Sequence, residues 1–500
     1  MLCRIRCYLA AALMMEGIPI LRRIALLFTL LTALLLPAAA TAGPAAPDVS
    51  RAAAERALDE ALDAFREPLA ASSGPAAGSR EVTGALRDLA VAVPALGKAD
   101  RRRARSLLAR PTDKNDRAYF GKEASDSPIC NANFCVHWTD KAANKPVSGF
   151  FLGQILASVD LSRAVENGTL GWRDAKSDGR LGSRKGKGAE GQVDVYVTNL
   201  GKRLYGYAAP DGGQRGQRRY AYLVLDNNYV GFPTNPLDSM RVTVAHEYNH
   251  ILQFNYDVYQ DLWLFEDTAT WAEDKVYPGI NDYLNYLPAF ARKSSRPMTG
   301  RSIKIYAEAV WNHWLSANYG DDVVRNTWRV SPKQKSFAVA AYNRAIKDAG
   351  GPGFGRALGG FFAATAEWKL DADFPDHGEY PDVKRAGKLT GRKKTTLDNT
   401  SYRLYDVEPS ADPEATLKVR AEKGTETSIS LVGRTGGGDV TTETAHLRKG
   451  GTGTVTIANP GAYARITAVV ANVDGSSKVN RKGKRVYKAD GSGYRVSLKG

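Results

Sequence analysis

The sequence predicts an α+β protein with three parts: a strand-rich lobe, a helical lobe that follows it, and an all-β domain at the C-terminal end. Runs rich in β-branched and aromatic residues occupy residues 134–230, separated by Gly-, Asp- and Lys-rich loops. From residue 239 to about residue 374 the apolar positions follow a helical spacing. After residue 397, short apolar runs alternate with Gly, Pro and Asn clusters, which is typical of a small β-sandwich.

The first 42 residues predict a cleaved secretory signal peptide. Arg22 and Arg23 precede the apolar run Ile24–Leu36, and a small-residue exit ends at Ala42. A membrane-spanning helix needs about 20 apolar residues, and neither this run nor any later one is long enough. We therefore expect a secreted, extracellular chain with no integral membrane span, and a retained N-terminal anchor is the alternative.

The net charge indicates where such a chain would sit. The formal net charge is +16, and residues 1–42 carry four Arg and one Glu, so the mature chain carries +13. Export excludes nucleic acid as the natural partner of this charge. An anionic cell surface is the partner that the remaining charge suggests.

Residues 43–115 predict an Ala-rich helical extension or pro-segment. The stretches Ala52–Phe65 and Thr83–Leu96 have helical spacing, and the basic run Arg101–Arg105 follows them. Aromatic residues are almost absent, so the segment offers a poor core of its own. A removed or inhibitory pro-segment and a loosely packed extension are both consistent with this composition.

Residues 116–383 are expected to form the central domain, which contains both the strand-rich and the helical lobe, and a local disulfide is expected near its start. Cys130 and Cys135 are the cysteines that remain after the signal region is removed, and an exported chain favours their pairing. A metal site that uses both cysteines and His137 is the alternative, but no fourth ligand lies nearby in the sequence.

The most specific motif is His246-Glu247-Tyr248-Asn249-His250, an H-E-x-x-H sequence. Residues four apart on an α-helix lie about 40° apart around its axis, so both imidazoles project from one face. Two neutral imidazoles at this spacing can hold one Zn²⁺. Glu247 lies beside that face, where it can accept a proton from an activated water. Two helical histidines that only pack are the alternative.

A catalytic zinc site of this kind needs a third protein ligand. Glu266 follows His250 by 16 residues, which leaves room for a helix end, a turn and a returning helix. Glu273 lies two turns beyond Glu266, on nearly the same face. Helical geometry alone does not choose between the two carboxylates.

The motif and the downstream stretch Asp261–Glu266 together resemble the gluzincin clan of zinc metallopeptidases, most closely its aminopeptidase-N-like branch. The resemblance implies a zincin-like fold, one catalytic Zn²⁺ held by Glu266 as third ligand, and Glu273 as a supporting residue beside it, with Asp267 grouped with Glu273. Phe265 and Asp267 depart from that branch's pattern. The Gly-x-Met-Glu-Asn stretch that captures a substrate amino terminus there is absent, so an endopeptidase is favoured.

The chain is also similar, from Phe134 to Gly320, to a family of secreted bacterial metalloproteases. That family is assigned mostly by its motif. The similarity therefore implies a fold and a zinc ion rather than a particular substrate.

Three weaker candidates complete the predicted site. Tyr222 and Val224 lie on a strand-like run that we expect to be an edge strand pairing with a peptide substrate, with an ordinary core strand as the alternative. Tyr306 is the candidate that stabilises the oxyanion of the tetrahedral intermediate. His313 lies on the same helical segment and is the weaker candidate for that role.

The sequence therefore predicts a secreted zinc-dependent endopeptidase that acts on a peptide or protein substrate. Residues 384–396 are expected to form a basic linker and residues 397–500 a β-sandwich accessory domain. Two other functions stay open: a catalytically silent zincin fold that binds the anionic cell surface, and a zinc hydrolase that acts on a non-peptide amide or ester.

Overall fold

A computed structural model gives the fold of the chain. It describes residues 48–65, 81–116, 119–120, 128–141, 145–179, 181, 191–201, 204–232, 234–335, 337–479 and 485–499. The chain divides into two units, Met1–Ala45 and Ala46–Gly500, and the description below concerns the second. The predicted signal peptide, residues 1–42, lies outside the described residues. None of the described helices is long and apolar enough to cross a bilayer.

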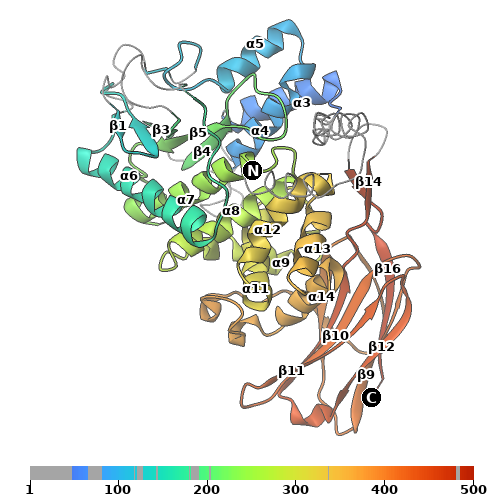
Figure 1. The fold of residues 1–500 in the computed structure, drawn as a ribbon. Coiled ribbons are helices and arrows are strands. Elements are labelled where there is room, and N and C mark those ends of the chain that lie inside the picture. Colours follow the sequence, from blue (N-terminus) through green and yellow to red (C-terminus); the bar gives the residue numbers. More distant parts are fainter. Residues whose placement is uncertain are drawn as a thin grey trace, which may run out of the picture. The chain divides into compact units, whose positions relative to one another are not determined.

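The predicted α+β class is confirmed, and the strand-rich lobe is built on one five-stranded sheet (Figure 1). Its strand order is β1-β2-β3-β5-β4. Strands β2, β3 and β5 are parallel, whereas β1 and β4 pair antiparallel at the two edges. The strands are β1 (Ile129–Cys130), β2 (Phe134–His137), β3 (Val193–Thr198), β4 (Gly206–Pro210) and β5 (Ala221–Asp226).

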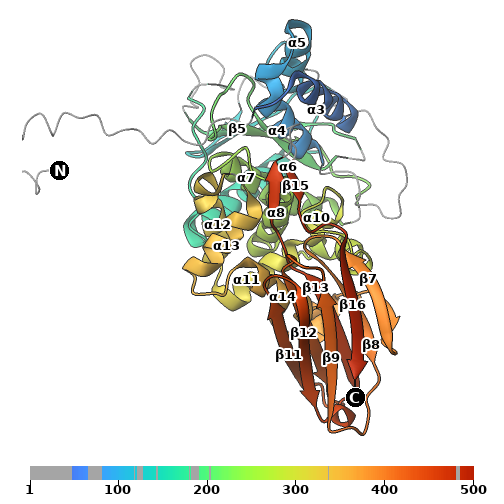
Figure 2. The same cartoon turned by 90° about the vertical axis from the view of Figure 1, so that its right-hand side faces the viewer.

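Helices cover both faces of this sheet, so its central strands are buried throughout. One face, which includes Val195 and Leu223, packs in the main core with α6 (Gly149–Arg163) and α7 (Pro236–Phe254). The other face, which includes Tyr196 and Tyr222, packs in a second core with three N-terminal helices. These are α3 (Arg51–Ala64), α4 (Glu81–Ala92) and α5 (Lys98–Leu107). Figure 2 shows α3 and α5 above β5 and α7 below it.

The expectation that the N-terminal extension packs loosely is wrong for its described residues. Leu58, Leu86 and Leu96 are each at most 2% exposed. The extension is poor in aromatic residues, but its helices pack on aromatic side chains that the sheet supplies, among them Tyr196 and Tyr207. A segment without a core of its own has therefore formed one jointly with the sheet.

The helical lobe begins with the pair α7 and α8 (Leu262–Val276), which pack along each other. Helix α7 starts where Pro236 occupies the first turn and the Asn235 side chain accepts a hydrogen bond from the Asp238 amide. The helices that follow enclose a core with several buried Trp side chains. They are α9 (Leu287–Arg292), α10 (Lys304–Ala307), α11 (Ala309–Tyr319), α12 (Asp322–Val330), α13 (Ala338–Asp348) and α14 (Phe354–Ala364).

The C-terminal region is rich in β-structure, as expected, and forms two main sheets with orders β11-β10-β13-β8-β6 and β12-β9-β16-β7. A separate two-stranded ribbon joins β14 (Ser477–Val479) to β15 (Arg485–Tyr487). The strands of the two sheets are β6 (Arg385–Lys388), β7 (Arg392–Leu397), β8 (Ser401–Val407), β9 (Glu414–Ala421), β10 (Thr427–Arg434), β11 (Val440–Leu447), β12 (Gly451–Ala458), β13 (Arg465–Asn472) and β16 (Ser492–Lys499).

The prediction of a basic linker at residues 384–396 is wrong, because most of that stretch forms β6 and β7. Strand β7 alternates exposed with half-buried positions, which is the pattern of an edge strand with charged side chains. Leu389, which lies between the two strands, is buried in the core of the β-region. Most basic residues of this stretch therefore lie on strands of the β-region and do not form a linker between two domains.

The β-region shares a core with the helical lobe. Tyr402 stacks on Phe362 with ring centroids 4.2 Å apart, and its hydroxyl accepts a hydrogen bond of 3.0 Å from Thr365. Glu367 pairs with Arg434 at 3.1 Å and with Arg465 at 3.5 Å. The two regions are thus joined by buried apolar and ionic contacts.

Candidate metal centre

His246 and His250 lie one turn apart on α7, as the motif predicts. Their side chains are at most 1% exposed, and their Nε2 atoms are 3.0 Å apart. Because both imidazoles project from the same side of the helix, the lone pairs of their Nε2 atoms can be directed at one metal ion.

Glu266 on α8 completes this group. Its Oε2 atom lies 3.2 Å from Nε2 of His246 and 3.5 Å from Nε2 of His250. Burial raises the pKa of this carboxyl, but the imidazoles of His250 and His246 outweigh that effect and lower the pKa to about 2. Among the described residues, these three form the group of His, Cys, Asp and Glu whose ligand atoms lie close enough for a metal ion, all within 4.8 Å of one another. Two imidazoles and one carboxylate match the donor set of a catalytic zinc site.

Glu273 contacts the other nitrogen of His246. Its Oε1 atom lies 2.6 Å from Nδ1 of His246, and both side chains are buried. A carboxylate at Nδ1 fixes the ring orientation and the tautomer, which leaves Nε2 as the nitrogen that could bind a metal ion. Helical geometry left Glu266 and Glu273 as alternatives for the third ligand. By position Glu266 is the candidate, because it lies near Nε2 of both histidines, whereas Glu273 contacts Nδ1 of His246.

A neutral amide takes the corresponding place beside His250. Oε1 of Gln253 lies 2.7 Å from Nδ1 of His250, and its Nε2 donates to Oδ1 of Asn249 at 2.6 Å and to Oγ1 of Thr268 at 2.8 Å. Sequence reasoning missed Gln253, although its place three residues after His250 on the same helix was a usable signal.

The same chain of hydrogen bonds reaches a buried carboxyl. Nδ2 of Asn249 donates to Oε2 of Glu166 at 2.8 Å. Glu166 lies in the π-helical turn Ala164–Thr169, a kind of irregularity that often occurs at functional sites. Burial raises the pKa of Glu166, against the effects of Asn249 and His246. No sequence spacing connects Glu166 to the motif.

Glu247 is also buried, and its partner comes from the N-terminal extension. The hydroxyl of Thr83 on α4 donates to Oε2 of Glu247 at 3.0 Å. The same Thr83 oxygen accepts a 3.0 Å hydrogen bond from the amide of Ala208 on β4. No sequence pattern links Thr83 to Glu247, because the two residues are 164 positions apart.

Of the two oxyanion candidates, the structure brings only Tyr306 close to the histidines. Its ring centroid lies 6.1 Å from that of His246, on helix α10. His313 lies against Tyr283 and Asp274, with its Nε2 atom 3.8 Å from Oδ2 of Asp274. Burial and then the charge of Lys275 lower the pKa of His313 to about 3. We therefore place His313 in a separate polar cluster.

The prediction that Asp267 supports the metal ligands is wrong by position. The hydroxyl of Tyr342 donates to its Oδ2 atom at 3.0 Å. Burial and the neighbouring carboxylate of Glu308 raise the pKa of Asp267 well above its usual range. Successive residues on an α-helix are rotated by about 100° around its axis, so Asp267 faces away from the side that carries Glu266.

The prediction that Tyr222 and Val224 lie on an edge strand is also wrong. Strand β5 runs between β3 and β4, and β4 is the edge. Both side chains are fully buried under the N-terminal helices, and the Tyr222 hydroxyl donates to the carbonyl of Ala109 at 2.7 Å. The connection of residues 211–220 returns the chain from β4 as an antiparallel neighbour, and β4 covers the hydrogen-bonding edge of β5.

The predicted disulfide between Cys130 and Cys135 is confirmed. The two cysteines face each other across β1 and β2. The alternative metal site with His137 is excluded, because the disulfide leaves neither sulfur as a thiolate ligand. Nε2 of His137 lies 2.7 Å from Oδ1 of Asp194.

Comparisons with known proteins add little to this geometry. A family of unknown function, DUF6055, matches residues 225–443, a range that includes α7 and α8. The solved structure of Legionella pneumophila aminopeptidase A in complex with aspartic acid is similar at 12% identity and a TM-score of 0.34. That likeness covers 67% of this chain and 35% of the other, so this chain spans well under half of that protein's length. At this TM-score it carries no argument. None of the curated proteins matches the chain.

Proposed function

We propose that the chain is a zinc-dependent endopeptidase. The observation that carries the proposal is the convergence of His246, His250 and Glu266 on one point, with the carboxylate of Glu247 beside them on α7. The donor set fits Zn²⁺, and the residues that orient both imidazoles are in place.

The side chains divide the work between binding and proton transfer. Zn²⁺ held by His246, His250 and Glu266 would supply Lewis-acid chemistry, which polarises a carbonyl oxygen and lowers the pKa of water. Glu247 accepts a proton from the attacking water and delivers it to the leaving amine. Of the two oxyanion candidates, Tyr306 has the ring near His246, and its hydroxyl donates a hydrogen bond to the developing oxyanion.

Two features favour a peptide substrate that is cut internally. Strand β4 is the sheet edge beside Glu247, and an extended peptide can add to such an edge through backbone hydrogen bonds. The sequence lacks the Gly-x-Met-Glu-Asn stretch that would capture a free amino terminus. We also propose that the protein acts after export, near an anionic cell surface.

The test compares the native chain with Glu247→Gln, which keeps the side-chain shape but removes the base. Each protein is incubated for hours with a proteome-derived peptide library, and new termini are identified by mass spectrometry. We expect internal cleavage by the native chain, at least about a hundredfold less by Glu247→Gln, and one zinc ion per chain in both. Equal cleavage by the two proteins would refute the role of Glu247. Stoichiometric zinc with no cleavage by the native chain or by any variant that keeps Glu247 would refute the peptidase.

A further inference from the structure

We infer that helix α4 is an intramolecular inhibitor, which occupies the substrate-binding edge of the proposed peptidase and must move before a peptide can bind. The inference rests on the proposed function, since it assigns an occupant to the proposed active site. It joins three groups of contacts: a threonine on the general base, a close approach to the start of α8, and polar contacts towards the C-terminal end of α4.

Thr83 engages the two groups that a peptide would need. Its hydroxyl donates to Oε2 of Glu247 and accepts from the amide of Ala208, each at 3.0 Å. A general base must direct a lone pair at the water it deprotonates. An added peptide strand must bond to the amides of the sheet edge. One buried hydroxyl therefore stands in for both the water and the substrate backbone.

Helix α4 also packs directly on the start of α8. A Cβ atom added to Gly84 would lie 2.6 Å from Cδ1 of Leu262, the first residue of α8. The guanidinium of Arg87 donates to the carbonyl of Gln260 and lies 4.8 Å from the ring centroid of Phe265, which precedes the ligand Glu266. A glycine at this point lets the backbone of α4 approach the helix that supplies the third ligand.

Polar contacts hold α4 in this place. Asp88 pairs with Arg301 at 2.7 Å, in the segment between α9 and α10. The guanidinium of Arg219 donates to the carbonyl of Ala90 at 2.8 Å. The pair between Asp88 and Arg301 lies at the surface, since the Arg301 side chain is 61% exposed. Such a contact is weak enough to break when a substrate or another protein competes for the site.

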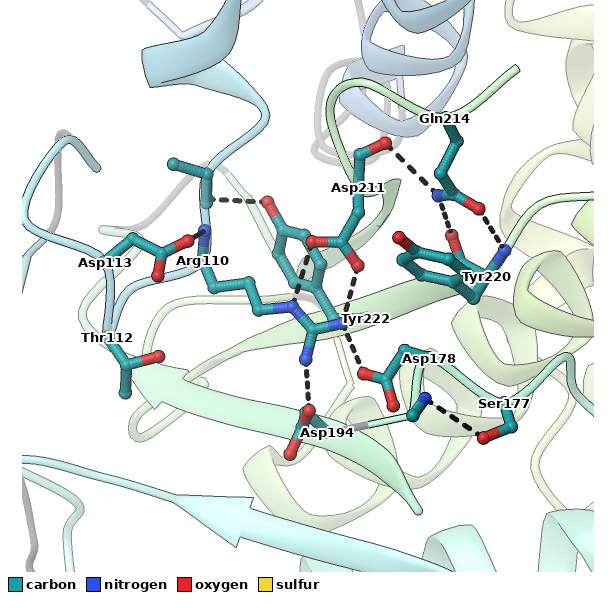
Figure 3. Close-up of polar contacts among 12 residues, drawn as sticks. Arg110, Thr112, Asp113, Ser177, Asp178, Asp194, Asp211, Gln214, Tyr220 and Tyr222 are labelled. Atoms are coloured by element: carbon teal, nitrogen blue, oxygen red, sulfur yellow. Dashed lines mark hydrogen bonds and ion pairs between the residues drawn. The ribbon is translucent and has the colours of Figure 1, made fainter. Parts of the chain in front are cut away.

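A stronger anchor lies at the far end of the extension (Figure 3). The guanidinium of Arg110 is buried and binds Asp211 through two hydrogen bonds, of 2.9 and 2.5 Å. It also pairs with Asp178 at 2.5 Å and with Asp194. Removing the whole extension would leave these three buried carboxylates without the guanidinium that neutralises them. The inhibitor is therefore part of the folded domain, and its test needs the full chain.

Two substitutions in the full chain should release α4 without touching the catalytic residues. Gly84→Trp cannot dock as the native helix does, because a Cβ already lies 2.6 Å from Cδ1 of Leu262 and the indole extends well beyond the reach of a shift of that side chain. Thr83→Val keeps the branched shape but removes the hydroxyl, and Thr83→Ser is the matched control that keeps it. We expect both releasing variants to cleave the peptide library at least tenfold faster than the native chain, and Thr83→Ser to cleave at the native rate. Amide hydrogen exchange should quicken across residues 81–92 in the two releasing variants alone.

The outcomes separate the inference from the proposed function. Native rates of cleavage in variants whose α4 exchanges quickly would overturn the inference, as would unchanged exchange in both variants. If no variant cleaves any peptide, the proposed function fails, and binding of a peptide hydroxamate then tests the occupied site alone. Tighter hydroxamate binding to Gly84→Trp than to the native chain would support the occupied site. Equal binding would refute it.

Discussion

The two histidines of the candidate metal centre differ in the group that orients each ring. His246 faces the carboxylate of Glu273, whereas His250 faces the amide oxygen of Gln253. A carboxylate makes the imidazole more basic, and a neutral amide fixes its direction with less effect on its charge. Gln253 in turn is held by Asn249 and Thr268. The direction of the His250 ring is therefore set by an extended hydrogen-bond chain rather than by one contact.

We expect Gln253→Ala to weaken zinc binding about 10- to 100-fold, because His250 then loses the acceptor that fixes its ring. Competition against a chelating dye measures the affinity. Gln253→Glu, which keeps an acceptor oxygen, should lose less than Gln253→Ala. Identical affinities for the native chain and Gln253→Ala would show that packing alone orients His250.

His313 should make the folded protein sensitive to acid. Burial and Lys275 lower its pKa from 6.5 to about 3, so the folded state keeps this ring neutral while the unfolded chain protonates below pH 6.5. Stability contributed by the neutral ring is complete above pH 6.5 and is lost as the pH falls towards 3, by at most about 1.4 kcal/mol per pH unit. Urea unfolding of the native chain and His313→Gln from pH 7 to 4 measures this. Their difference in unfolding free energy should shrink with acid, and a constant difference would contradict the assignment.

At the scale of elements, one arginine makes the buried ionic link from the extension to the sheet. Arg110 follows α5 and is surrounded by three aspartates on other segments. Burial raises the pKa of Asp178 to about 6, although the charge of Arg110 opposes that shift. The arginine thus balances carboxylates that would otherwise repel one another.

We expect Arg110→Met to lower the free energy of unfolding by about 3–5 kcal/mol, because it leaves buried carboxylates without a partner. Arg105→Ala, on the exposed side of α5, is the control and should change stability by less than about 0.5 kcal/mol. Denaturant titrations followed by circular dichroism give both values. A loss below about 1 kcal/mol for Arg110→Met would mean that the carboxylates protonate or rehydrate at little cost.

Local spacing was enough to predict some elements and not others. The four-residue spacing of His246 and His250 predicted their common face on α7, and the seven-residue spacing of Glu266 and Glu273 predicted that both lie on nearly one face of α8. The order of strands depends on pairing between distant segments, so the sequence could not show that β4 rather than β5 is the edge. Thr83 was out of reach for the same reason, since its contact with Glu247 exists only once the sheet and both helices are assembled.

Across the whole molecule, the β-region and the helical lobe should unfold together. Tyr402 belongs to the same buried core as Phe362, and Glu367 binds two arginines of the β-region. A shared core couples the stability of the two regions, so neither can unfold without exposing apolar surface of the other.

We expect Tyr402→Ala to cost about 3–5 kcal/mol and to shift one common melting transition, because it removes a buried aromatic ring between the regions. Differential scanning calorimetry records the transition, and zinc release reports on the helical lobe. Val440→Ala, at a side chain 46% exposed on β11, is the control and should leave the transition in place. Two separate transitions in Tyr402→Ala would show independent domains.

The two edges of the five-stranded sheet are closed in different ways. Helix α4 covers β4, while β1 has only two residues and is tied to β2 by the disulfide between Cys130 and Cys135. An uncovered strand edge is a template on which a second chain can pair. Reduction of the disulfide loosens one edge, and displacement of α4 opens the other. A chain in which the disulfide is reduced and α4 is displaced would thus expose two unpaired strand edges. We expect such a chain to self-associate through these edges.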